Sequence, residues 1–200
     1  YNADSWLIGS PSIGNLDSDN DLEIVVGGFS SSGKKVYAVN YDGTPVNGYP
    51  IEIGEKIQRG ISLYDFNQNG VDDMVFGTDS NNIYLMYDDG TIAEGFPFEG
   101  DDKFRVAPII INHNYGIIIV AASKNGTIYG INTEGELIFS TSVGSEITTS
   151  PVFSIENSQP RIFFGSAIGD VYAIDLIGNI IDGFPFNVGE NIISGSIMLS

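Results

Sequence analysis

Short runs of apolar residues, broken by turn residues, recur along this chain at a nearly constant distance. Four of these runs place a tyrosine among branched or aliphatic residues, at 36–39, 83–86, 128–131 and 171–174. The steps between Tyr37, Tyr84, Tyr129 and Tyr172 are 47, 45 and 43 residues. A repeat of that length, built of strands and turns alone, is typical of a β-propeller blade.

The other elements of the repeat keep the same register. Each repeat opens on a small residue, three positions after an apolar one; the small residues are Ser10, Gly60, Ala107 and Ser150. A second strand follows, and glycines in turn positions come after the tyrosine strands, at Gly43, Gly90, Gly135 and Gly178. Three repeats end in an aromatic-proline pair, which suits an outer edge strand because proline cannot donate to a ladder. Each repeat therefore predicts a four-stranded antiparallel sheet.

These repeats predict an all-β chain of four blades, over residues 7–54, 57–102, 104–145 and 147–190. Residues 192–200 resemble the opening of a repeat, with Ile192 matching Leu7 and Gly195 matching Ser10. We interpret them as the first strand of a fifth blade. A closed four-bladed ring has no place for such a strand, so we expect the chain to be part of a larger propeller, or to associate through an open edge.

Composition narrows the possible partners. The chain has 26 acidic and 8 basic residues, a formal net charge of −18, and no cysteine. Nucleic acid and anionic membranes need a basic surface, so neither is expected as a partner. The longest apolar stretch, 117–122, is far too short to span a bilayer, and no signal peptide is recognisable, so no membrane insertion is expected. Disulfides and zinc-thiolate sites are excluded.

The first two repeats carry a nine-residue acidic loop between their first and second strands, at 15–23 and 65–73. Both loops place oxygen-bearing side chains at loop positions 1, 3, 5 and 9. Calcium takes six to eight oxygen ligands, and position 7 would contribute a backbone carbonyl, which explains Val71. Position 6 must turn sharply, and Asn20 and Gly70 tolerate a positive φ. Solvated turns are the simpler alternative; an EF-hand is disfavoured because the loop is short and no flanking helices are predicted.

Three features together resemble FG-GAP/VCBS-type repeats. They are the loop spacing, the Phe-Gly strand ends at 76–77 and 164–165, and the Ser-Pro or Ala-Pro openings at 10–11, 107–108 and 150–151. These build the calcium-binding propellers of integrin α-subunits and of bacterial surface and secreted proteins. The resemblance implies two Ca²⁺ sites in an extracellular, cell-surface or periplasmic protein. The implied ligands are Asn15, Asp17, Asp19, Asp21 and Glu23 in the first loop, and Asp65, Asn67, Asn69, Val71 and Asp73 in the second.

The two loops differ from each other and from the remaining repeats. Three ligand carboxylates in the first loop against two in the second predict tighter binding at the first site. The third and fourth repeats are shortened at this place, to 112–116 and 156–159, and lack the carboxylates. We expect these two blades to be metal-free.

The favoured function is a non-catalytic binding, adhesion or scaffold module for a protein or glycan ligand. The alternative is the propeller portion of a carbohydrate-active enzyme, a polysaccharide lyase or hydrolase, whose catalytic residues lie elsewhere. The lone His113 is expected in an exposed turn, and Arg59 and Arg105 are the only candidates for a lyase base. The single Trp6 disfavours WD-type and quinone-dependent propellers. The recurring tyrosines are expected to pack between blades.

Overall fold

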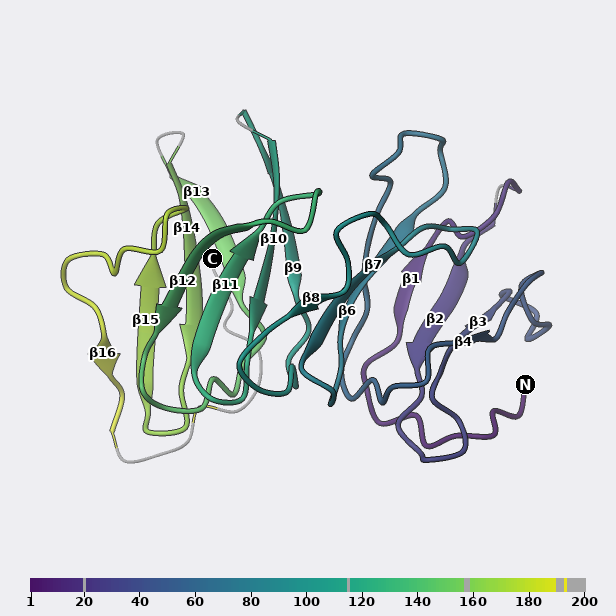
Figure 1. Ribbon diagram of the computed structural model, residues 1–200, viewed down its shortest axis with the longest axis horizontal. Coiled ribbons are helices and arrows are strands. Elements are labelled where there is room, and N and C mark those ends of the chain that lie inside the picture. Colours follow the sequence, from purple (N-terminus) through teal and green to yellow (C-terminus); the bar gives the residue numbers. More distant parts are fainter. Residues whose placement is uncertain (20, 115, 157–158, 190–192, 194–200) are drawn as a thin grey trace.

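The described part of the chain is built of β-strands (Figure 1). A computed structural model describes residues 1–19, 21–114, 116–156, 159–189 and 193. Over these residues it contains sixteen strands, in four antiparallel sheets of four strands each, and the strand order within every sheet follows the chain. Four-stranded antiparallel blades, as predicted, are confirmed. No helix among the described residues is long and apolar enough to cross a membrane.

The four sheets, here called blades 1 to 4, each run from a first, inner strand to a fourth, outer one. Blade 1 consists of β1 (Ser12–Gly14), β2 (Glu23–Gly27), β3 (Lys35–Val39) and β4 (Ile51–Glu52). Blade 2 consists of β5 (Ser62–Tyr64), β6 (Asp73–Gly77), β7 (Asn82–Met86) and β8 (Phe98–Glu99). Blade 3 consists of β9 (Ile109–His113), β10 (Gly116–Ala122), β11 (Thr127–Ile131) and β12 (Leu137–Ser142). Blade 4 consists of β13 (Val152–Glu156), β14 (Gln159–Gly165), β15 (Asp170–Ile174) and β16 (Phe186–Asn187).

The second and third strands of each blade carry most of the core, and in blades 2 and 3 a neighbouring blade covers both of their faces. In β6 and β11 every residue is buried, on both faces of the pleat, which explains why the sequence shows continuous apolar runs there instead of strict alternation. The buried residues fall into three clusters, one between each pair of successive blades. Packing between blades therefore supplies most of the buried apolar surface of this fold.

Three of the four recurring tyrosines, Tyr84, Tyr129 and Tyr172, belong to or pack against these clusters, whereas Tyr37 contacts Tyr1 and Asp4 of the N-terminal segment. Tyr84 packs against the cluster between blades 1 and 2, and its ring stacks on Phe76 at a centroid distance of 5.3 Å. Tyr172 stacks in the same way on Phe164, also at 5.3 Å, between blades 3 and 4. In each pair the two residues face each other across the second and third strands of the blade. The two stacked rings therefore pack against the preceding blade.

The small residues at the openings lie where the inner strands crowd together. A side-chain carbon added to Gly60 would lie 3.5 Å from the Ala107 methyl group and 3.6 Å from the Ser10 carbonyl oxygen. The Ala107 amide in turn donates to the Ser150 hydroxyl at 3.0 Å. Residues that open successive repeats are thus spatial neighbours, and larger side chains would separate the inner strands.

Blades 1 and 4 lie at opposite ends of the arrangement, so the described residues do not close a ring (Figure 1). Ile57 and Phe104 each cover the glycine that ends the second strand of the preceding blade, and Ile193 covers Gly165 in the same manner. The predicted fifth-blade strand, 192–200, otherwise lies outside the described residues. Ile193, one position after the predicted match Ile192, occupies the place of an opening apolar residue.

Candidate metal site

The acidic loop of blade 1 brings three carboxylates together. Antiparallel pairing of Gly14 with Glu23 forms the base of the hairpin, and the loop turns back above it. One carboxylate oxygen from each of Asp17, Asp19 and Glu23 lies within 4.8 Å of the other two. Two side-chain turns hold the loop: Asp17 Oδ1 accepts from the Asp19 amide at 2.9 Å, and Asp19 Oδ1 from the Asp21 amide at 2.7 Å. Oxygens this close repel one another unless a cation lies between them.

Glu23 is the residue that most clearly fits a cation. Its side chain is 0% exposed. Oε2 accepts a hydrogen bond from the Leu16 amide at 2.7 Å, whereas Oε1 is buried and has no hydrogen-bond partner. Burial raises the pKa of this carboxyl above its ordinary value, and the charges of Asp17, Asp19 and Asp21 raise it further. A buried, half-satisfied carboxylate costs free energy, and a divalent cation bound at Oε1 would remove that cost.

The other two expected ligands of this loop differ from each other in burial. Asn15 Oδ1 is buried without a hydrogen-bond partner, which suits a metal ligand. Asp21 is exposed, and its carboxylate is not among the three that converge. A role for position 7 through its backbone carbonyl is compatible with that placement. Asn20 at position 6 lies outside the described residues.

The loop of blade 2 repeats this hydrogen-bond pattern with fewer charges. Asp73 is buried, and its Oδ2 accepts from the Phe66 amide at 2.9 Å, as Glu23 does from Leu16. Asn67 and Asn69 accept from the amides two residues later, at 3.0 and 2.8 Å. Gly70 has a φ of +91°, as its position in the turn requires.

The first and last side chains of this second loop already have protein donors. Asp65 accepts from the Asn69 and Gly70 amides at 3.0 and 2.8 Å, and Asp73 Oδ1 accepts from the Asp88 amide at 3.0 Å. Burial raises the pKa of Asp73. Because backbone donors already satisfy both of its expected ligand carboxylates, this loop depends less on a cation than the first loop does.

The two loops are joined to each other, a contact that the sequence did not reveal. The Asn15 amide donates to Asp72 Oδ2 at 3.0 Å, and the Asp72 amide donates to the Asn15 carbonyl at 2.7 Å. Asn15 Nδ2 also donates to the Gly70 carbonyl at 2.6 Å. A side-chain carbon on Gly14 would lie 2.5 Å from Asp72 Oδ2. The only hint in the sequence was an acidic residue at loop position 8, where no ligand was expected.

A second set of missed residues consists of the carboxylates that meet the tyrosines. Tyr84 donates to Glu55 at 3.0 Å and Tyr37 donates to Asp4, so the segments before blades 1 and 2 are tied to the blade that follows. Burial, with the nearby Glu55 charge, raises the pKa of Tyr84 to about 12. In the sequence, the signal for these contacts was a carboxylate two to three residues before the apolar residue that opens the repeat.

The residues considered for catalysis are placed differently from expectation. His113 is half-buried at the end of β9, not in an exposed turn, because the strand continues to the tip of its hairpin. Arg105 forms a fork on Asp79, with Nε and Nη2 both at 2.9 Å from its carboxylate oxygens. Arg59 donates to the Arg105 carbonyl at 3.1 Å. Both arginines thus have structural contacts.

With this architecture the chain is a β-propeller. The solved structures similar to it include BamB from Moraxella catarrhalis, with a TM-score of 0.62 and 16% identity over 90% of this chain and 50% of that one. BBS1N, crystallised in complex with ARL6DN, gives 0.65 and 16% over 88% and 51%. The C-terminal WD40 domain of Sif2 gives 0.55 and 14% over 82% and 42%.

The chain therefore spans about half the length of the first two of these propellers. At such identities the likeness concerns the fold alone. No protein-family model and no curated protein matches the sequence.

Proposed function

We propose that this chain is a calcium-stabilised propeller module that binds a partner macromolecule, most simply a protein, and has no catalytic role of its own. The observation that carries the calcium assignment is the buried Oε1 of Glu23, which lies without a protein partner beside the carboxylates of Asp17 and Asp19. Oxygen-only ligands in an irregular loop suit Ca²⁺ better than transition metals. The ion would fix the hairpin and offset part of the net charge of −18.

The resemblance to FG-GAP/VCBS-type repeats belongs to this proposal. Its support is the matching hydrogen-bond pattern of the two loops, in which positions 3, 5 and 9 play the same roles. An extracellular, surface or periplasmic location follows from it, because weak calcium sites fill at the millimolar concentrations found outside cells.

A protein partner is supported by the fold and by the surface. BBS1N, a propeller of similar fold, was crystallised with ARL6DN. The end faces of blades 1 and 4 expose apolar side chains, including Ile13 and Leu22 at one end and Phe186 at the other. We propose that these faces associate with further blades or with another chain, because exposed apolar sheet faces favour burial.

Calcium titration by isothermal calorimetry tests the metal assignment. The wild-type chain is expected to bind two ions, the tighter one in the loop of blade 1. Asp17→Ala should remove the tighter event and leave one ion in the loop of blade 2. Asp182→Asn, which neutralises an exposed carboxylate of blade 4 outside both loops, should titrate like the wild type. Loss of both events in Asp17→Ala, or no binding to the wild type at millimolar calcium, would contradict the assignment.

A further inference from the structure

Two neighbouring hollows open at the end of the propeller that carries the acidic loops. One, of about 960 Å³, lies between blades 3 and 4, and the other, of about 710 Å³, lies between blades 2 and 3. They share Ile117, Thr133 and Glu134 as a common wall. The two hollows are therefore parts of one groove across three blades, divided by the β11–β12 turn.

The shortened hairpins of blades 3 and 4 explain why the groove exists. Between blades 1 and 2, the long loops meet through Asn15 and Asp72 and occupy the space above the sheets. In blades 3 and 4 only two residues separate the first strand from the second. The larger hollow lies between these two hairpins and the turns that follow β11 and β15. The smaller hollow lies between blade 3 and Phe66, which belongs to the acidic loop of blade 2. The larger hollow thus lies where both hairpins are short and the calcium ligands are absent.

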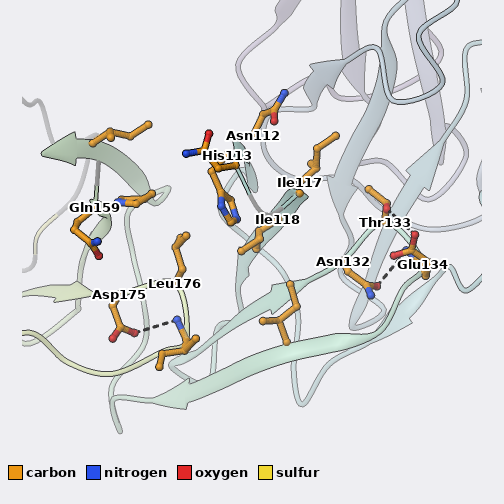
Figure 2. A pocket seen from close by; sticks show the side chains of 16 residues that line it. Asn112, His113, Ile117, Ile118, Asn132, Thr133, Glu134, Gln159, Asp175 and Leu176 are labelled. Carbon is orange, nitrogen blue, oxygen red and sulfur yellow. Dashed lines mark hydrogen bonds between the residues drawn. The ribbon is translucent and has the colours of Figure 1, made fainter. Parts of the chain in front are cut away.

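The chemistry of the groove is apolar and acidic. Figure 2 shows Glu134 and Asp175 on opposite sides of the larger hollow, with His113 and Ile118 between them. Glu94 adds a third carboxylate in the smaller hollow. No lysine or arginine occurs among the described residues that line either hollow, so no cation of the protein itself neutralises these groups.

Several isoleucines of the larger hollow are exposed to an unusual degree. Ile177 is 68% exposed, Ile155 54% and Ile138 41%. Isolated exposed apolar residues are common, but several around one concave surface indicate a contact site. The lining also includes the exposed amide of Gln159, which can hydrogen-bond to a peptide backbone. The amides of Asn112 and Asn132 already donate to Tyr64 and Glu136.

We propose that this groove binds an extended peptide segment of a partner protein in which aliphatic side chains alternate with lysine or arginine. Aliphatic side chains would bury the exposed isoleucines, and the basic ones would meet Glu94, Glu134 and Asp175. Phe66 and Tyr87 line the smaller hollow and add apolar surface for aliphatic side chains. A neutral glycan would leave the exposed isoleucines and the three carboxylates without complementary groups, so a basic, aliphatic peptide suits the groove better. The inference rests on the proposed binding role, and it does not require calcium.

Fluorescence anisotropy with a labelled eight-residue peptide of alternating lysine and isoleucine tests the proposal. The peptide is held at nanomolar concentration and the protein is titrated, in EDTA and again in millimolar calcium. Binding is expected in both conditions and should weaken as sodium chloride rises from 50 to 500 mM, since exposed charge pairs are screened. Peptides with glutamate for lysine, or serine for isoleucine, should not bind.

Two matched double variants distinguish binding in the groove from attraction to the acidic protein as a whole. Glu94→Gln with Glu134→Gln removes two exposed carboxylates from the groove and should weaken binding about 3- to 10-fold, as expected for exposed ion pairs. Glu52→Gln with Glu99→Gln removes two exposed carboxylates from outer strands away from the groove and should leave binding unchanged. Ile177→Lys, at an exposed site, should abolish it. Circular dichroism and melting curves check that each variant is folded.

Equal weakening by the two double variants would overturn the proposal, because net charge alone would then explain binding. No binding to the wild type, or equal binding of the glutamate peptide, would overturn it as well. Calorimetry with calcium reports separately on the metal assignment, so a chain that binds calcium but not the peptide would refute the groove alone.

Discussion

Replacing Glu23 with glutamine should have opposite effects on stability without and with calcium. Without metal, the buried Oε1 of Glu23 lacks a partner close to two other carboxylates. Glutamine keeps an oxygen for the Leu16 amide and adds an NH₂ group that can donate to Asp17 or Asp19. Relief of an unsatisfied buried group amounts to about 1–3 kcal/mol. At about 2–4 °C per kcal/mol for a chain of this size, Tm in EDTA should rise by roughly 2–12 °C.

With calcium the order should reverse. An ion that binds only the folded state at 100 times its Kd adds about 2.7 kcal/mol to the wild type, and the Glu23→Gln variant loses that gain at the first loop. Urea unfolding, in EDTA and in excess calcium, measures both free energies. Glu99→Gln, an exposed carboxylate outside the loops, should change neither by more than about 0.5 kcal/mol. A variant that is less stable than the wild type in EDTA would refute the argument, because Glu23 would then be a structural hydrogen-bonding residue rather than a cation ligand.

The pH dependence of the free energy of unfolding is a second, independent test of the role of Glu23. Burial raises the folded-state pKa of Glu23 above its ordinary value of 4.5. At pH values between 4.5 and the raised pKa, the Glu23 carboxyl is protonated more often in the folded protein than in the unfolded one. The metal-free free energy of unfolding therefore falls as the pH rises through this range. Glu23→Gln should make this fall shallower, leaving the part that comes from Asp73, whose pKa is also raised.

Three further substitutions test the packing and the contacts between blades. Asp72→Ala removes the acceptor for the Asn15 amide and should cost about 1 kcal/mol in urea unfolding, with faster hydrogen exchange at Asn15; unchanged exchange would contradict a link between the loops. Tyr84→Phe keeps the stacking on Phe76 and loses only the bond to Glu55, so a cost of about 0.5–1.5 kcal/mol is expected from thermal melts. Phe104→Ala empties a buried site between blades 2 and 3 and should cost about 3–5 kcal/mol in urea; a loss below 1 kcal/mol would contradict the importance of that interface.

The sequence predicted the strands and the sheet class because both follow from local periodicity. The tyrosine strands, turn glycines such as Gly43 and Gly90, and aromatic-proline pairs each specify a local conformation that recurs. The small opening residues recur in the same register, and in the structure Gly60 lies beside Ala107 and Ser10. Because the pattern occurs four times in the chain, a single sequence was enough to predict the fold.

Features that depend on how neighbouring blades face each other could not be predicted in this way. Asp72 reaches Asn15, 57 residues away, only because two hairpins lie side by side. His113 was expected in a turn, since nothing in the sequence indicated that β9 extends to the hairpin tip. The groove arises from two shortened hairpins and one turn together, and the shortening was visible in the sequence only as lost ligands.

Melting curves in chelator and in millimolar calcium test the central claim most directly. If calcium binds the folded chain as proposed, the free energy of unfolding should rise by roughly 2.7 kcal/mol per site at 100 times Kd, and Tm should rise with calcium concentration but not with equal sodium chloride. Curves that coincide in EDTA and in millimolar calcium would contradict the account.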